Sequence, residues 1–181
     1  PLFAMILAIN LARPSAMGNG AHNRTVGRLL VMGAIATVPF MLLGGDLISG
    51  WPLNAFFTLA VAAMMIQRLA RPGRARMPVA IGFLVVGGAL VEYWWPAVGI
   101  TAGTWLMLTR RSWIAGVLVL AGFAGLGFIN GNQWALAAPA LIAVAAVLPP
   151  IPVPRLRIFF YVYYPAHFAV IYAIACTLAP G

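Results

Sequence analysis

Apolar residues run along most of the chain and are interrupted at fairly regular intervals by arginine, glycine and proline. The interruptions leave eight apolar segments, at about 1–12, 26–43, 54–69, 78–93, 95–109, 112–129, 133–149 and 156–178. A helix that crosses a bilayer needs roughly 20 predominantly apolar residues. The pattern therefore predicts an all-α fold, a polytopic transmembrane helix bundle of about eight membrane segments that forms one domain over residues 1–181.

The connection between the fourth and fifth segments is unusually short. Only the stretch from Glu92 to Pro96 separates 78–93 from 95–109. The two segments form either a tight helical hairpin or a re-entrant pair, and the sequence leaves both open. Gly99 and Gly103, spaced four apart, permit a close approach between helices.

Composition supports a membrane protein, because 64% of the residues are hydrophobic and only 7% are charged. The net charge of +9 comes from eleven arginines against Asp46 and Glu92. In a soluble protein this balance would suggest nucleic acid, but here the arginines are confined to short loops between apolar segments. We expect the lipid bilayer as a partner and no nucleic acid. The single cysteine, Cys176, predicts neither a disulfide nor a metal site.

Charge alternates from loop to loop. Both acids fall in even-numbered loops, and the odd-numbered loops carry the arginines, namely Arg13, Arg24, Arg28, Arg68, Arg71, Arg74, Arg76, Arg110, Arg111, Arg155 and Arg157. Cytoplasmic loops of membrane proteins are enriched in arginine and lysine. The arginine-bearing loops are therefore predicted to be cytoplasmic, which places the C-terminus outside.

The last segment contains the main candidate for chemistry. His167 lies near its middle, two residues after Pro165, which tends to kink a helix. An ionisable side chain at membrane depth is costly and usually faces a bundle interior or an aqueous cavity. His167 is either such a functional group or a neutral histidine that bonds a neighbouring helix. Tyr163 and Tyr164 lie at the same depth, where a buried hydroxyl needs a partner.

Few other polar residues fall inside the segments. Asn54 and Thr58 are one turn apart on the third segment, so both can face the same neighbouring helix. Such groups more often bond helices together than form a site. His22, beside Asn23 and Arg24 in the first basic loop, is expected to be a solvated loop residue.

Three stretches in order resemble the TraX family. These are PLFAMILAINLAR at 1–13, which resembles the family's second helix, NAFFTL at 54–59, which resembles a polar helix start, and FYVYYPAH at 160–167, which resembles the closing motif. GITAG at 99–103 is a weaker match. The resemblance covers nearly the whole chain, but the family's first helix, with its Asp-His pair, would precede Pro1. We therefore expect an N-terminally truncated chain that is inactive if its base lies on that helix.

The resemblance implies a multi-pass protein of the bacterial inner membrane. The founding type acetylates a pilin subunit, which implies transfer of acetyl from acetyl-CoA to the N-terminal amine of a pilin-like partner. It implies His167 as the catalytic residue, Asn54, Thr58, Tyr163 and Tyr164 as substrate-binding or supporting residues, and no metal. Arg155, Arg157 and Arg13 are the candidates to bind the CoA phosphates, since arginine offers a planar, permanently charged fork.

Two other classes of function fit the sequence. In a proton-coupled transporter, His167 would relay protons along the last segment, although such proteins usually carry several intramembrane ionisable groups. In a non-catalytic assembly partner, faces of small residues would bind a hydrophobic pilin helix. An additional Asp-His pair upstream would favour the acetyltransferase.

Overall fold

The computed structural model describes all residues except 19, 45–47, 49, 150–158 and 179–181. Within those limits the chain is helical, with two isolated β-bridges in place of strands. In chain order the elements are α1 (Leu2–Ala12), α2 (Pro14–Gly18), α3 (Ala21–Leu42), α4 (Ala55–Ala70), α5 (Arg76–Gly82), the π-helical turn η1 (Phe83–Gly87), α6 (Gly88–Leu90), α7 (Trp94–Arg110), α8 (Trp113–Asn130), the 3-10 turn η2 (Trp134–Leu136), α9 (Ala137–Val147) and α10 (Phe159–Leu178). The predicted all-α fold is confirmed, and each predicted segment contains a helix.

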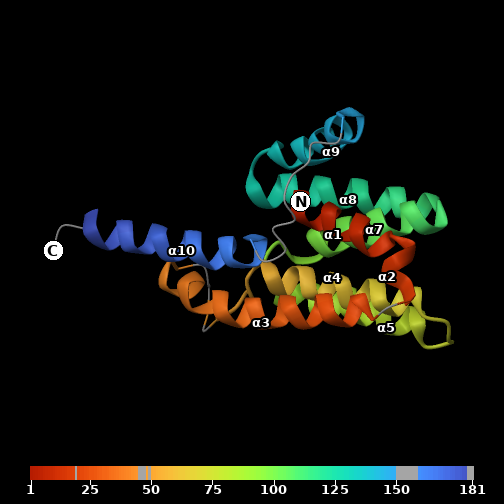
Figure 1. Ribbon diagram of the computed structural model, residues 1–181, viewed down its shortest axis with the longest axis horizontal. Helices are drawn as coiled ribbons and strands as arrows, with labels where there is room; N and C mark the ends of the chain where they lie inside the picture. Colours follow the sequence, from red (N-terminus) through yellow and green to blue (C-terminus); the bar gives the residue numbers. More distant parts are fainter. Residues whose placement is uncertain (19, 45–47, 49, 150–158, 179–181) are drawn as a thin grey trace.

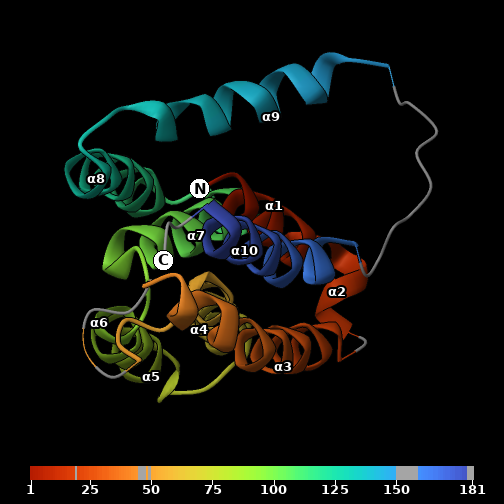
Figure 2. The ribbon, with the colours of Figure 1, turned by 90° about the vertical axis from the view of Figure 1, so that its left-hand side faces the viewer.

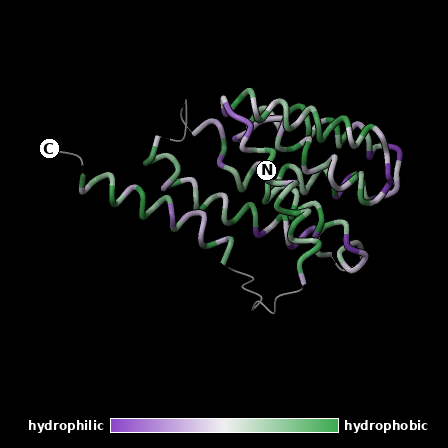
Figure 3. The backbone as a smooth tube through the Cα atoms, turned by 90° about the horizontal axis from the view of Figure 1, so that it is seen from above, coloured by the Kyte–Doolittle hydropathy of each residue, from purple (hydrophilic) through white to green (hydrophobic). Residues whose placement is uncertain are grey.

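The predicted number of membrane spans is not confirmed. In the described chain, α3, α8 and α10 are long and apolar enough to cross a membrane, whereas the apolar helices at 2–12, 55–70, 76–90 and 134–147 are shorter. Apolar residues line the lengths of the helices, as Figure 3 shows. The structure thus supports several membrane-spanning helices but leaves the count of about eight as a prediction.

The main core forms where α1, α3, α4 and α7 meet (Figures 1 and 2). Alanine is the most frequent of its buried side chains, and small residues of this kind let membrane helices approach closely. Members with no exposed surface include Ala8, Ala36, Ala60, Ala63 and Ala102. α4 lies at the centre and contacts the three other helices, so its two ends define the two ends of the bundle.

One end of the bundle collects the arginine-bearing connections that the structure describes, those around α3, α4 and α7. The Arg110 guanidinium, in the last turn of α7, donates from Nη2 to the Leu69 carbonyl oxygen at the end of α4, at 2.6 Å. Gln67 of α4 donates to Asn23 in the first turn of α3. The termini of α3, α4 and α7 that carry arginines therefore lie together, and we call this the arginine-rich end.

The other end holds the short connection between the fourth and fifth predicted segments. Val91, Glu92 and Tyr93 join α6 to α7, and Val91 forms a parallel bridge with Leu53, just before α4. From this connection α7 runs back to Leu69 at the far end of α4, so α7 extends along the full length of α4. The two segments are helices joined by a tight connection, and whether each crosses the membrane stays a prediction. We call this the Glu92 end.

α10 is attached at the Glu92 end and projects beyond it. Its first half packs on α3 and α4, where Phe168 meets Phe40 edge to face and Phe56 meets both Tyr161 and Tyr164. Its second half continues past the end of α3, as the views in Figures 1 and 3 agree. None of its residues is fully buried. The aromatic motif predicted from the sequence is thus the part of α10 that contacts the bundle.

Two glycines set the distance between α7 and α8. A Cβ at Gly122 would stand 2.8 Å from the Pro96 carbonyl oxygen, and one at Gly103 would stand 2.9 Å from that of Ala115. A backbone oxygen cannot move aside as a flexible side chain does, so the helices would have to separate. The close helix approach predicted from the glycine spacing is confirmed at Gly103.

We expect Gly122→Ala to destabilise the bundle by about 1–3 kcal/mol, the usual cost of overpacking a close contact. Gly116→Ala is the matched control on the same helix, because its added methyl meets no atom within 4 Å. Thermal unfolding in detergent, followed by circular dichroism, measures both. Equal melting temperatures for the two variants would contradict the role assigned to the close approach of α7 and α8.

Candidate functional site

A polar cluster at the Glu92 end joins three elements that are distant in sequence. The N-terminus of α4, the connection at 91–93 and the first half of α10 all contribute to it. Three of the predicted site residues, Asn54, Thr58 and Tyr164, belong to the cluster, and Glu92 lies among them. The sequence did not single out Glu92 as a site residue, although a lone acid at the end of an apolar segment was a usable signal.

Asn54 begins α4 and ties it to α3. Its Oδ1 accepts from the Phe56 amide at 3.1 Å, a standard N-cap bond, and its Nδ2 donates to the Gly33 carbonyl oxygen at 2.8 Å. Thr58, one turn later, donates instead to the Glu92 backbone oxygen at 2.6 Å. The expectation that both residues face the same neighbour is wrong. As the cap, Asn54 lies outside the helix and does not follow helical spacing.

The Glu92 carboxyl group is half-buried against α10. Its Oε2 accepts from the Tyr164 hydroxyl at 3.4 Å, and that hydroxyl accepts in turn from the Ala55 amide at 3.3 Å. Glu92 lies in the connection between α6 and α7, outside the helices. Burial raises the pKa of its carboxyl above the ordinary value, against smaller opposing effects of hydrogen bonds from Tyr93, Tyr164 and the Ala55 amide. A carboxylate with a raised pKa is a stronger base than an ordinary one, so Glu92 is a candidate to accept a proton.

The backbone beside Glu92 is strained. Tyr93 and Trp94 adopt positive φ angles of 62° and 47°, in the left-handed region that bulky residues seldom occupy. Trp95 Nε1 donates to the Val85 carbonyl oxygen at 3.0 Å, within the π-helical turn of the preceding helix. Strained residues and π-helical turns occur often at functional sites. The strained residues directly follow Glu92, and the π-helical turn ends five residues before it.

His167 lies on α10 one turn after Tyr163. Its Nδ1 is 3.1 Å from the Tyr163 carbonyl oxygen, and its ring stacks on those of Tyr163 and Phe168. Because a carbonyl oxygen only accepts, Nδ1 carries the proton in the neutral ring, and Nε2 keeps its lone pair. The centroid of the Tyr164 ring is 5.5 Å from that of His167. The histidine and Glu92 thus flank one tyrosine.

The remaining predicted site residues are not part of this cluster. Arg13 follows α1, whose last turn lies at the arginine-rich end, and is exposed. α4 is 16 residues long, so roughly 24 Å separates the two ends. Arg155 and Arg157 lie outside the described residues. Tyr163 is 52% exposed and contributes ring contacts to Phe159 and His167.

The prediction that His22 is a solvated loop residue is wrong. It lies in the first turn of α3 and is only 7% exposed. Its Nε2 donates to the Leu11 carbonyl oxygen at 3.3 Å, which joins α3 to the end of α1. The helix begins five residues earlier than the predicted segment at 26–43, because its polar first turn is held through His22 and Asn23 by contacts with α1 and α4 rather than by an apolar pattern of its own.

The described residues hold no group of three or more histidine, cysteine, aspartate or glutamate side chains placed to bind a metal. The Glu92 end brings together a carboxyl group, a phenol and an imidazole. These groups can move a proton and donate hydrogen bonds.

The features above define an all-helical protein that has helices suited to cross a membrane and a polar cluster at one end of its bundle. The family described as TraX protein matches residues 1–175. The chain belongs to the TraX family, which confirms the resemblance noted in its motifs. No curated protein and no solved structure matches the chain.

Proposed function

We propose that this protein is a membrane-embedded acetyltransferase that transfers acetyl from acetyl-CoA to the N-terminal amine of a pilin-like subunit. The observation that carries the proposal is the contact between the Glu92 carboxyl group and the Tyr164 hydroxyl, with His167 beside the same tyrosine. Membership of the TraX family is consistent with a conjugation-related, pilin-associated protein. The bilayer, the inner membrane of a bacterium, and the pilin subunit are the partners that this function requires.

The reaction needs a base, a donor of hydrogen bonds and a leaving thiol. The amine nitrogen attacks the thioester carbonyl carbon, a C–N bond forms, the C–S bond breaks, and coenzyme A leaves as the thiol. Glu92 or Nε2 of His167 accepts the proton that the amine loses, and this proton can pass to the leaving sulfur. The Tyr164 hydroxyl is the nearest donor for the oxyanion that develops on the carbonyl oxygen.

The proposal gives the two ends of the bundle different tasks. If the arginine-rich end faces the cytoplasm, as the positive-inside rule predicts, acetyl-CoA enters there. Its phosphates would stay near the arginines while the extended pantetheine arm carries the acetyl group into the bundle toward the Glu92 end. The acceptor amine would then be presented at the Glu92 end, next to α10.

The direct test is mass spectrometry of a pilin subunit from cells that lack or express the protein as its own gene encodes it. We expect the N-terminal amine to be acetylated only when the protein is present, and purified protein to acetylate a pilin N-terminal peptide with acetyl-CoA. A pilin that stays unmodified in both conditions would contradict the proposal.

Proton-coupled transport is the second candidate, and the same cluster supports it. A carboxyl group and an imidazole on either side of one phenol form a short path for protons, which the sequence alone offered only at His167. Transport predicts that a proton gradient drives solute uptake into proteoliposomes without any change in the mass of a pilin. If the protein is an acetyltransferase, the mass of the pilin increases by one acetyl group and a proton gradient drives no solute uptake.

A further inference from the structure

Three tryptophans meet at the Glu92 end, and the acetyl-transfer proposal gives none of them a role. The ring of Trp94 packs against those of Trp51 and Trp95, with centroids 5.9 and 5.6 Å away. Trp51 lies just before α4, whereas Trp94 and Trp95 begin α7 directly after the Glu92 connection. The three rings, which we call the tryptophan cluster, therefore join the start of α7 to the segment that leads into α4.

Two of these indoles also donate hydrogen bonds to the helical stretch before Glu92. Trp51 Nε1 donates to the Ala89 carbonyl oxygen at 2.9 Å, and Trp95 Nε1 donates to the Val85 carbonyl oxygen at 3.0 Å. The last carbonyl groups of a helix have no partner within it. Since Ala89 is the next-to-last residue of α6, the Trp51 indole supplies a partner that the helix lacks. The cluster thus holds the chain on both sides of Glu92.

The backbone of Glu92 is fixed between these attachments. Its amide donates to the Leu53 carbonyl oxygen at 2.7 Å, and its carbonyl oxygen accepts from the Thr58 hydroxyl at 2.6 Å. Tyr93 and Trp94, which follow, have φ angles of 62° and 47°. Left-handed conformations of bulky residues persist only where the surrounding structure enforces them. The indole bonds on either side of this turn are contacts that can do so.

Gly88 leaves the space that the Trp95 ring occupies. A Cβ at Gly88 would stand 2.6 Å from Trp95 Cδ1, closer than such atoms approach. A larger residue would therefore push the indole away from Val85. Gly82, in α5 earlier on the same helical stretch, has open space where its Cβ would be.

We propose that Trp51 and Trp95 are positioning residues, which hold the strained turn at 92–94 so that the Glu92 carboxyl group meets the Tyr164 hydroxyl. The inference rests on the proposed function only for the use of that carboxyl group. Without the two indole bonds, the turn can relax to ordinary φ angles and carry the carboxyl group away from α10. The groups that face it now are Tyr93 of the same turn, Tyr164 of α10 and the Ala55 amide of α4, with His167 beyond Tyr164.

An infrared titration of Glu92 in the purified protein tests this positioning role. The sequence has two acidic side chains, so comparison with Glu92→Gln assigns the band of the protonated Glu92 carboxyl group. Trp51→Phe and Trp95→Phe keep a ring but lose the N–H donor. We expect each to lower the pKa of Glu92 toward the ordinary value, because the carboxyl group leaves its buried place. Trp113→Phe, the same change at a 78% exposed side chain in the first turn of α8, should leave this pKa unchanged.

Gly88→Ala tests the cluster without replacing a tryptophan. Its methyl group should displace the Trp95 ring and shift the titration of Glu92 in the same direction. Gly82→Ala is the matched control and should not shift it.

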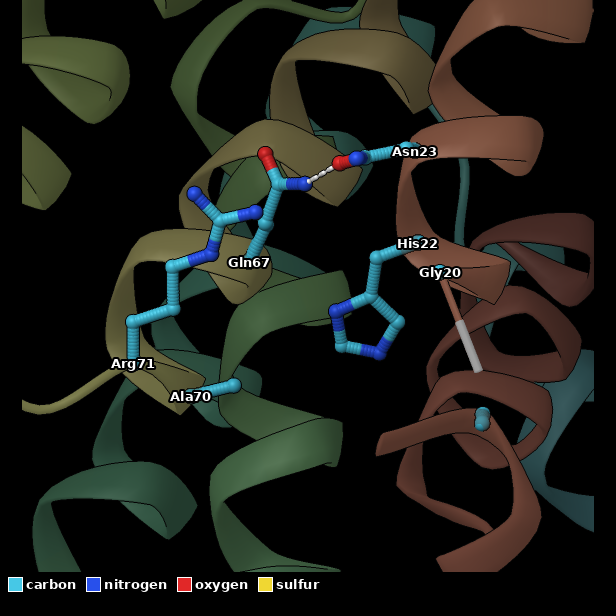
Figure 4. A pocket seen from close by; sticks show the side chains of 7 residues that line it. Gly20, His22, Asn23, Gln67, Ala70 and Arg71 are labelled. Atoms are coloured by element: carbon cyan, nitrogen blue, oxygen red, sulfur yellow. Dashed lines mark hydrogen bonds between the residues drawn. The ribbon is translucent and has the colours of Figure 1, made fainter. Parts of the chain in front are cut away.

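Gln67→Ala controls for a general loosening of the contact between α3 and α4. It breaks the hydrogen bond from Gln67 to Asn23, which lies beside a cavity of about 270 Å³ that His22 also lines (Figure 4). This contact is at the arginine-rich end, one length of α4 away from Glu92. The variant should therefore leave the titration of Glu92 unchanged.

The acetylation rate gives a second readout. Trp51→Phe and Trp95→Phe should lower kcat by up to about 100-fold, as expected when a catalytic group is misplaced. KM should change little, because both indole N–H groups are bound to backbone oxygens.

A titration of Glu92 that none of the three cluster variants shifts, or that the three controls shift equally, would overturn the positioning role. A protein that acetylates no pilin but shows the expected shifts would contradict acetyl transfer and support the positioning role.

Discussion

Glu92→Gln is expected to reduce pilin acetylation by about 100- to 10,000-fold, the range that general acid–base catalysis usually contributes. Glutamine has nearly the same shape as glutamate, and its amide oxygen can still accept from the Tyr164 hydroxyl and the Ala55 amide. The variant loses only the ability to accept a proton. Rates measured on an N-terminal pilin peptide with purified protein would give the size of the effect.

The pH dependence of the rate distinguishes a catalytic role of Glu92 from a structural one. Because burial raises the pKa of Glu92, the wild-type rate should fall as the pH decreases through that raised value, where the carboxylate becomes protonated. The folded protein favours the protonated form of the Glu92 carboxyl group. The contribution of this group to the free energy of unfolding is therefore complete below the pKa it has in the unfolded chain. It is lost as the pH rises through the higher pKa it has in the folded protein. In the Glu92→Gln variant, neither the rate nor the free energy of unfolding should show this dependence on pH.

Asp46→Asn is the control for this prediction, since it removes the only other carboxylate side chain of the sequence. It should leave the rate and its pH profile unchanged. An active Glu92→Gln variant that keeps the wild-type pH profile would show that the Glu92 carboxyl group is not the base.

His167→Ala is expected to reduce acetylation by about 100-fold or more, because it removes the free Nε2 lone pair beside Tyr164. α10 should stay folded, since the side chain is half-buried and bonds only to its own helix. Tyr163→Phe is the matched control. It keeps the ring that stacks on His167 and deletes a hydroxyl on the exposed side of α10, so its rate should stay near that of the wild type.

A double variant tests whether the two groups act together. If Glu92 and His167 serve one proton transfer through Tyr164, the Glu92→Gln and His167→Ala changes combined should cost little more than either alone, as found for groups that act as a unit. Fully additive losses would assign them to separate steps. Full acetylation by His167→Ala would leave the histidine with a structural role on α10.

The ends of the helices were largely predictable from local chemistry. α7 ends at Arg110, with Arg111 as its C-cap, and Gly131 with a φ of 64° is the C-cap of α8. Such signals act over a few residues, so they are visible without the fold. α3 is the exception, because its first turn, which contains His22, is held by contacts with α1 and α4.

The candidate site was predictable only in part. Tyr164 and His167 stand out because aromatic and ionisable residues inside an apolar segment need partners. Their partners could not be named, since the Tyr164 hydroxyl meets a carboxyl group 72 residues away and an amide 109 residues away. Asn54 was seen as a polar residue of a span, whereas its place just before an apolar run was an N-cap signal.

The sequence by itself determined that the chain is a bundle of apolar helices, and it predicted the arginine-bearing connections to lie on one side. Those properties depend on which residues avoid water, and composition along the chain records that directly. Only the tertiary structure decided that α10 joins the bundle at the Glu92 end, that Glu92 meets Tyr164, and that His22 is buried beside a cavity. The physical reason is that lipid and neighbouring helices are equally apolar. The pattern of apolar residues therefore cannot tell which face of a helix meets another helix and which meets lipid.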